Sequence, residues 1–168
     1  MPLVSRPLYR TRQFIAALRP HVDEAESSAA RTLLGPELSP LFDSMTPRDR
    51  RHSLDVYGKL LDTGCEDADT LAAALLHDSG KGRLSGVTVR LWHRVAYVVL
   101  DAAAPTALRR LSRSGSGLSV LRRHPEIGAR LAQSMGASPK VVQMIRDHER
   151  VKHDDSSLAQ LRAADDDS

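Results

Sequence analysis

Cysteine, aromatic residues and long hydrophobic runs are all scarce in this sequence. The single cysteine, Cys65, excludes an internal disulfide and agrees with a reducing compartment. No apolar run approaches the roughly 18 to 20 residues that cross a bilayer, and the first residues lack the apolar stretch of a signal peptide. The six aromatic residues offer no stacking platform for single-stranded nucleic acid. We therefore predict a cytoplasmic protein with no membrane partner and no nucleic-acid partner.

What is present is the composition of an ordinary globular domain. The 168 residues are 41% apolar and 27% charged, which suits one domain with a buried core. The net charge of +3 combines a basic middle with an acidic tail at Asp165–Asp167. We interpret the basic residues as solvated helix faces: Arg109, Arg110, Arg113, Arg122 and Arg123. The seven histidines stand out, because histidine is the commonest metal ligand and proton carrier near neutral pH.

The spacing of apolar residues is helical along the chain, with no strand-like alternation. It predicts an all-α fold of seven to nine helices, in which residues 1–45 pack as N-terminal helices on a core of residues 46–168. The expected helices lie at about residues 8–18, 25–34, 47–63, 68–79, 87–100 and 108–111, then from Pro125 to Gly136, from Pro139 and from Ser156 or Ser157.

Two of these segments are especially informative. Thr46 followed by Pro47, with Asp49 in a capping-box position, is the clearest helix start in the chain. The segment 71–76 is apolar on nearly every side, so its helix is predicted to lie at the centre of the domain, with Asp67 as its N-cap.

Four histidines fall where side chains from different helices can converge. His52 lies in the first turns of the helix after Pro47, and His77 ends the buried apolar helix. His124 precedes the proline that is expected to open a helix, and His148 lies one turn beyond an inward apolar stripe. The remaining three are predicted to be exposed or packing residues: His21, His93 and His153.

The His77–Asp78 doublet carries most information. Adjacent residues of a regular helix point about 100° apart, so both can face one ion only where the helix ends, and Gly80 provides such an end. The doublet can also be a core histidine capped by its neighbouring aspartate. Lys81 places a cation beside the doublet, which suits an anionic substrate.

The residues around this doublet resemble those of a known family. The run 73–81 (AALLHDSGK), together with Arg51–His52 upstream and 161–165 (LRAAD) downstream, resembles the HD-domain metal-dependent phosphohydrolase superfamily over about residues 46–166. The family's ligand order is a histidine, a His-Asp doublet and a distant aspartate. The resemblance therefore implies the metal ligands His52, His77, Asp78 and Asp165, with Asp165 chosen over the adjacent Asp166 and Asp167 from its spacing after Leu161.

Two further segments resemble the binuclear branch of that superfamily, which includes cyclic-dinucleotide phosphodiesterases. They are 124–128 (HPEIG) and 146–149 (RDHE), and they would add His124 and His148 as ligands. The sequence departs from the cyclic-di-GMP enzymes in having Asp147-His148-Glu149 where they have His-His-Glu, in lacking their Gly-Tyr-Pro signature, and in having Ser79 at a usually aliphatic position.

Nitrogen and carboxylate ligands without thiolate favour divalent ions such as Fe, Mn, Mg, Co, Ni or Zn, and six ligands suit two ions. The resemblance implies Fe or Mn first, with Asp78 as the bridge. Two ions can convert a bridging water into a hydroxide nucleophile, and Lys81 would neutralise the phosphate, so Asp78 and Lys81 are the expected catalytic residues.

We expect hydrolysis of a phosphomonoester or phosphodiester, with a small phosphorylated or nucleotide substrate. Two alternatives stay open: a di-iron oxygenase of the same superfamily, and a non-catalytic metal-binding signalling module.

Overall fold

The computed structural model describes residues 21–168 except 114 and 151–155. Within these residues the protein is all-helical, with eight α-helices, two short 3-10 turns and no strands, so the all-α prediction is confirmed. The helix expected at residues 8–18 lies outside the described residues. The elements are α2 (Glu24–Asp43), α3 (Pro47–Asp62), α4 (Ala68–Leu76), η1 (Ser79–Lys81), η2 (Arg83–Ser85), α5 (Leu91–Ala103), α6 (Pro105–Leu111), α7 (Gly117–Ser134), α8 (Pro139–Asp147) and α9 (Ser156–Asp166).

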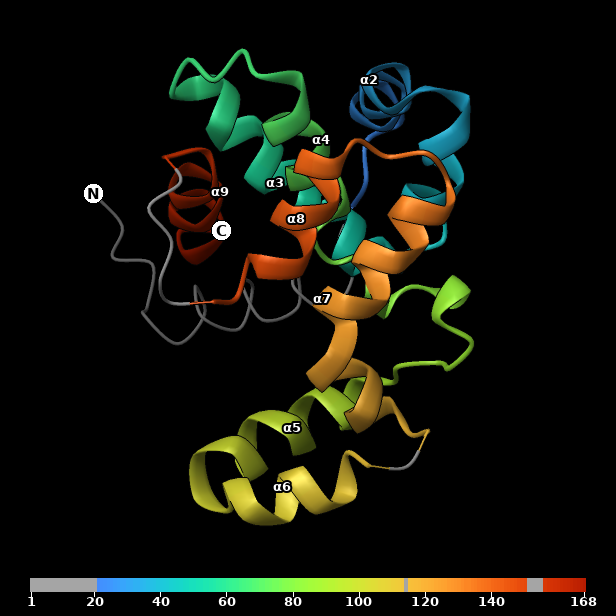
Figure 1. Cartoon of the computed structure of the whole chain (residues 1–168), viewed down its shortest axis with the longest axis vertical. Coiled ribbons are helices and arrows are strands. Elements are labelled where there is room, and N and C mark those ends of the chain that lie inside the picture. Colours follow the sequence, from blue (N-terminus) through green and yellow to red (C-terminus); the bar gives the residue numbers. More distant parts are fainter. Residues whose placement is uncertain (1–20, 114, 151–155) are drawn as a thin grey trace, which may run out of the picture.

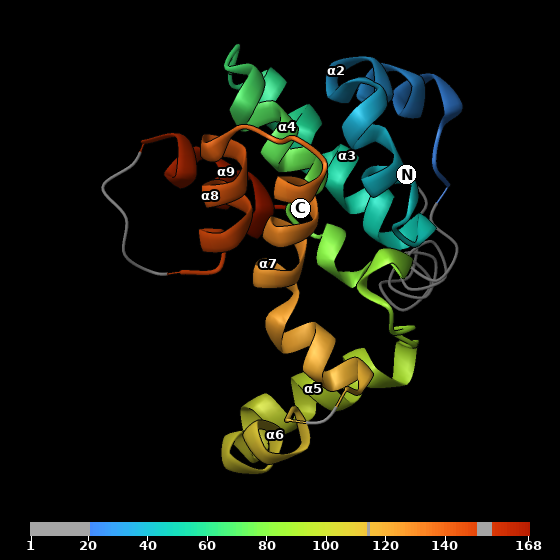
Figure 2. The same ribbon diagram turned by 45° about the vertical axis from the view of Figure 1, so that its right-hand side comes forward.

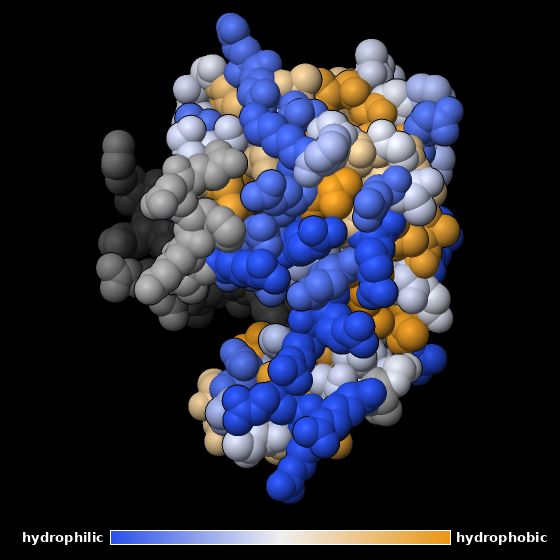
Figure 3. All heavy atoms as spheres, in the orientation of Figure 1, coloured by the Kyte–Doolittle hydropathy of each residue, from blue (hydrophilic) through white to orange (hydrophobic). Residues whose placement is uncertain are grey.

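The helices form a body and a projecting hairpin. Helices α2, α3, α4, α8 and α9 make up the body, and the long helix α7 runs from it to the hairpin of α5 and α6 (Figures 1 and 2). On the face shown in Figure 3, hydrophilic side chains extend from the body down to the hairpin. The chain thus has one main mass and one extension, joined by a single helix.

Helix α4 lies at the centre of the core, as its apolar sequence predicts. Residues Ala73 to Leu76 are 0% exposed, and they pack in one cluster with apolar side chains of α2, α3, α7, α8 and α9. A second, smaller cluster of Val89, Val120 and Leu121 joins the base of the hairpin to α7. The polar residues that follow α4 are therefore carried into the middle of the body.

Side-chain caps define the helix starts that the sequence predicts. Thr46 accepts a hydrogen bond from the backbone N–H of Asp49, and Asp67 accepts one from Thr70. Ser138 caps α8 in the same way. These caps satisfy backbone donors that the first turn of a helix leaves free.

Several predicted helix boundaries differ from the structure: α4 ends at Leu76 rather than near residue 79, and α6 begins at Pro105 rather than at Leu108. Helix α2 is interrupted at Gly35 (φ 70°, ψ 175°), where the sequence predicts its end, but helical structure resumes and reaches Asp43. Helix α5 begins at Leu91 rather than Val87.

The prediction that Pro125 opens a helix is wrong. Pro125 lies inside α7, which begins at Gly117 after the N-cap Ser116. Proline removes one helical N–H, and here the carbonyl of Leu121, four residues earlier, accepts a hydrogen bond from the His124 ring instead (2.7 Å). The proline is tolerated because a side chain takes the place of the missing backbone donor.

None of the helices in the described residues combines the length and the hydropathy that a membrane span requires.

Candidate metal centre

The structure brings the six predicted ligands together from five parts of the chain. They come from α3 (His52), the C-cap of α4 and the residue after it (His77 and Asp78), the middle of α7 (His124), the C-cap of α8 (His148) and the last turn of α9 (Asp165). His77, Asp78, His124 and His148 are all at most 4% exposed. The cluster therefore lies at the point where the helices of the body meet.

Within the cluster, two groups of three residues share one carboxylate. His52, His77 and Asp78 place one ligand atom each within 4.8 Å of one another, and so do Asp78, His124 and His148. Oδ1 of Asp78 lies 3.8 Å from Nε2 of His77 and 3.3 Å from Nε2 of His124. Asp78 thus stands between two sets of donors, each of which can hold a metal ion.

Three histidine rings are held in the same way, through Nδ1. The Nδ1–H of His77 donates to the Ala74 carbonyl at 2.8 Å, and that of His148 donates to Ile145 at 2.8 Å, both at helix ends where carbonyls lack backbone partners. His124 uses the carbonyl that Pro125 leaves free. Because a carbonyl only accepts, Nδ1 carries the proton and Nε2 offers its lone pair to the cluster, the usual arrangement for a ligating histidine.

Among the described residues, the inward Nε2 of His77 has no hydrogen-bond partner, and those of His124 and His148 lie near each other and near Asp78. Nε2 of His77 is buried and makes no hydrogen bond of standard geometry. Nε2 of His124 and Nε2 of His148 lie 3.3 Å apart, so two lone pairs face each other unless a cation lies against them. Buried ring nitrogens with lone pairs beside carboxylates fit a bound metal ion, because ligation would satisfy the unpartnered Nε2 of His77 and separate the two facing nitrogens.

The surroundings of the cluster favour the charged form of Asp78 and Asp165 and the neutral form of His148. Burial, together with the nearby His77 and His124, lowers the pKa of His148 to about 3, so its ring is neutral at pH 7. Burial alone would raise the pKa of Asp78, but Lys81 and the neighbouring histidines hold it well below its usual value. His77 shows the opposite balance: burial lowers its pKa, but Asp78 and Asp165 outweigh burial and raise it.

Asp165 is the tail carboxylate that reaches the cluster. Its Oδ1 lies 2.8 Å from Nε2 of His52 and 3.5 Å from Nε2 of His77, whereas Asp166 and Asp167 are exposed. Partial burial favours the neutral form of Asp165, but the hydrogen bond with His52 and the nearby His77 lower the pKa of Asp165 far below its usual value. It therefore adds a second negative charge on the His52–His77 side.

Lys81 lies at the border between the cluster and solvent. Its Nζ is 2.6 Å from Oδ1 and 2.8 Å from Oδ2 of Asp78. The turn between them requires Gly80, because a Cβ there would lie 2.0 Å from the His124 carbonyl oxygen. This close approach of η1 to α7 brings Asp78 and His124 into one site.

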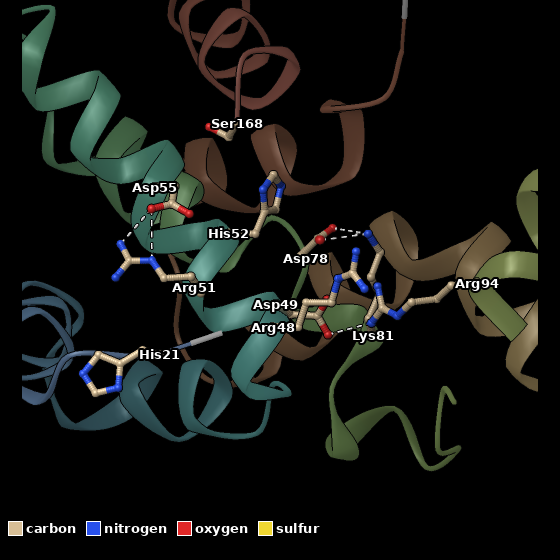
Figure 4. Close-up of a pocket in the computed structure, with 10 residues that line it drawn as sticks. All are labelled: His21, Arg48, Asp49, Arg51, His52, Asp55, Asp78, Lys81, Arg94 and Ser168. Atoms are coloured by element: carbon tan, nitrogen blue, oxygen red, sulfur yellow. Dashed lines mark hydrogen bonds and ion pairs between the residues drawn. The ribbon is translucent and has the colours of Figure 1, made fainter. Parts of the chain in front are cut away.

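A cleft of about 580 Å³ opens onto the cluster at His52, Asp78 and Lys81. Figure 4 shows its basic side chains, among them Arg48 and Arg94, around the Asp78–Lys81 pair. The arrangement can bind an anion next to the ligand cluster.

Sequence reasoning missed two of these basic residues and one acid. Arg48 is one helical turn before His52 on α3, a spacing that could have indicated it. Arg94 comes from α5 and is fixed by the buried Asp49 (2.7 Å), a contact across 45 residues that no local signal indicates. Glu149 approaches Nε2 of His124 at 3.6 Å.

The histidines predicted to be incidental differ in their places. His21 is exposed and lines the cleft. His93 packs: it is 9% exposed, stacks on Trp92 and accepts a hydrogen bond from the Arg90 backbone. His153 lies outside the described residues.

No protein-family model matches the sequence, and neither a curated protein nor a solved structure matches it. The site is therefore interpreted from its own geometry and chemistry.

Proposed function

We propose that this protein is a metal-dependent phosphohydrolase, which cleaves a phosphomonoester or phosphodiester with two divalent ions bound at the six-residue cluster. One observation carries the proposal: two sets of inward histidine nitrogens share the Asp78 carboxylate beside a cleft that is lined by four cationic and three acidic side chains. The order of these residues along the chain also supports kinship with the HD-domain superfamily.

The donor set is suited to borderline and hard divalent ions. Imidazole and carboxylate ligands without a thiolate suit Fe, Mn, Co, Ni, Zn or Mg, and we propose Fe or Mn. His52, His77 and Asp165 would hold one ion, His124 and His148 the other, and Asp78 both. Two ions held in this way would activate water as a nucleophile and offset the charge that develops on phosphoryl oxygens.

The chain's own residues account for substrate binding. Lys81 is a flexible point charge beside Asp78 and can neutralise a phosphate oxygen. Arg94 is ion-paired with Asp49, and Arg48 is exposed at the cleft, so Arg48 can offer positive charge to an anionic substrate on entry. The cleft volume suits a small phosphorylated compound or a nucleotide.

The test measures metal content and hydrolysis together. His77→Ala and Asp78→Ala should each lose bound metal and lose hydrolysis of nucleotides and of a generic phosphodiester. Because both residues are buried, His52→Ala serves as a second variant: its side chain is 31% exposed, so it should lose metal and activity while still folding. Elemental analysis, circular dichroism and an activity assay give the three readouts; the assay follows phosphate release for nucleotides and release of the alcohol group for the phosphodiester.

His21→Ala is the matched control, since it changes a histidine that lines the cleft but lies outside the ligand cluster. It should keep its metal. Wild-type metal content in His52→Ala, His77→Ala and Asp78→Ala would overturn the proposal.

The same measurements separate the two alternatives. Oxygen uptake that requires two redox-active irons would identify a di-iron oxygenase, whereas turnover with Mn or Mg alone supports hydrolysis. Metal-dependent stability without turnover on any phosphate ester would identify a non-catalytic module.

A further inference from the structure

The outer side of α5 exposes an unusual amount of apolar surface. Among the described residues, five large hydrophobic side chains of this one helix are between 52% and 67% exposed: Leu91, Trp92, Val95, Val98 and Val99. We call these five residues the apolar α5 face. Exposed apolar patches of this kind mark contact sites.

The apolar α5 face is one continuous stripe. Leu91, Val95 and Val98 follow the i, i+4, i+7 spacing that puts residues on one side of a helix, and Trp92 and Val99 flank them. The opposite side is occupied, because His93 is buried and Tyr97 packs against the small core at the base of the hairpin. The helix is therefore packed on one side and open on the other.

Basic residues are frequent in the segment that carries this stripe, from the start of α5 through α6 to the first turns of α7. Residues 87–123 contain seven arginines and a single acid, Asp101. Six of the arginines are exposed: Arg90, Arg109, Arg110, Arg113, Arg122 and Arg123. Within the described part of the chain none of the six forms an ion pair, since the paired arginines are Arg31, Arg50, Arg51, Arg94 and Arg150. The hairpin and the start of α7 therefore carry positive charge that ion pairs among the described residues do not neutralise.

We propose that the apolar α5 face docks on an anionic lipid surface, with the side chains of the face in the interfacial region and the exposed arginines of the hairpin and of the start of α7 drawn to the headgroups. An amphipathic helix with aliphatic residues and tryptophan on one side and arginines nearby is suited to such a surface. The hairpin projects from the body, so the face can reach a flat surface (Figures 1 and 2). The expectation of no membrane partner came from the lack of a spanning run, which a peripheral contact does not need.

The positive charge argues against a second copy of the chain as the partner that covers the apolar α5 face. Two copies would each bring six exposed arginines, unpaired among the described residues, and one aspartate near the interface, and like charges would repel. The apolar stripe argues against nucleic acid, whose phosphates attract arginine but leave valine side chains without a partner.

Trp92 makes the proposal directly measurable, because it is the only tryptophan of the chain and lies on the face. Phosphatidylcholine vesicles containing phosphatidylglycerol should shift its fluorescence emission to shorter wavelength and co-sediment with the protein. Vesicles of phosphatidylcholine alone should do so at least roughly tenfold more weakly, and salt should weaken binding to the anionic vesicles.

Val95→Glu with Val99→Glu should reduce anionic-vesicle binding by roughly tenfold or more, since it puts charges into the stripe. Leu61→Glu, on an exposed leucine of α3 (45% exposed), is the matched control and should bind as the wild type does. The proposal is overturned if neither the emission nor the sedimentation responds to anionic vesicles, or if light scattering shows a dimer that the double variant dissociates.

Discussion

Three histidine rings, those of His77, His124 and His148, are held in the same orientation around Asp78. Each ring donates a hydrogen bond from Nδ1–H to the backbone carbonyl three residues earlier. This hydrogen bond fixes the tautomer and the orientation of the ring before any metal ion binds. The three Nε2 atoms then lie close to Asp78, and among the described residues that of His77 has no hydrogen-bond partner. Pre-orientation of this kind lowers the entropic cost of binding a metal ion.

The three consecutive aspartates of the tail allow a matched test at this scale. Asp165→Asn should weaken metal binding by roughly tenfold or more, because it removes a charged donor that lies beside His52 and His77. Asp167→Asn changes an exposed residue two positions later and should leave affinity unchanged. Calorimetric titration of the metal-free protein with Mn²⁺ measures both. Equal affinities would remove Asp165 from the site.

At the scale of elements, the site depends on the close packing of η1 against α7. Gly80 allows this contact because any Cβ at that position would meet the His124 backbone. The 3-10 turn after α4 and the helix that carries His124 are thereby held at a fixed separation. A small residue thus sets the position of Asp78 relative to His124.

Gly80→Ala should therefore destabilise the protein by about 1–3 kcal/mol through overpacking, and should weaken metal binding as well. Gly58→Ala is the control, since a Cβ at Gly58 within α3 meets nothing within 4 Å. This control should raise stability by about 0.5–1 kcal/mol, because alanine favours the helix. Urea unfolding of both variants gives the comparison, and a neutral Gly80→Ala would contradict the packing argument.

The start of α4 is fixed by a charged cap. Hydrogen bonds from Lys140 and Thr70 lower the pKa of Asp67 from 3.8 to about 2. Because the pKa of Asp67 is lower in the folded state, its charge contributes stability above about pH 4, and that contribution is lost as the pH falls from 3.8 toward 2.

We expect Asp67→Ala to cost about 1 kcal/mol of unfolding free energy at pH 7, and we expect a smaller difference from the wild type at pH 3. Unfolding in urea at the two pH values checks this. Glu66→Ala, at the exposed neighbouring residue, should change stability by less than about 0.5 kcal/mol at either pH. A cost at Asp67 that does not depend on pH would mean that the charge plays no part.

At the scale of the whole molecule, the proposed metal centre would fasten the helices together. Its six residues come from α3, α7, α8, α9 and the end of α4, so metal binding should stabilise the body as a unit. A ligand that binds only the folded state adds about 2.7 kcal/mol at 100 times its Kd.

A chelator should accordingly lower the Tm of the metal-loaded protein by about 5–10 °C, and added Mn²⁺ or Fe²⁺ should restore it. Differential scanning calorimetry measures the shift. His52→Ala should show a much smaller shift, and an unchanged wild-type Tm after complete metal removal would contradict a metal centre that spans the helices.

Much of this arrangement could be predicted from local sequence. Helix starts with a cap and a proline, such as Thr46–Pro47, specify a boundary within a few residues, and the apolar segment 71–76 specified a buried helix. The predicted helix start at Pro125 is wrong. From sequence alone, a proline inside a helix cannot be told from one at its first turn, because the distinction depends on what bonds the carbonyl four residues earlier. The Arg94–Asp49 pair joins segments 45 residues apart and has no local signature.

The sequence by itself determined the helices and the chemical types of the candidate ligands, because helical periodicity, caps and donor atoms are properties of neighbouring residues. Only the tertiary structure decided that His124 and His148 face each other, that Asp165 is the tail carboxylate that reaches the cluster, and that α5 keeps an apolar side uncovered. Those outcomes depend on how helices distant in sequence pack, which is set by the burial of the whole core and by close approaches such as that at Gly80.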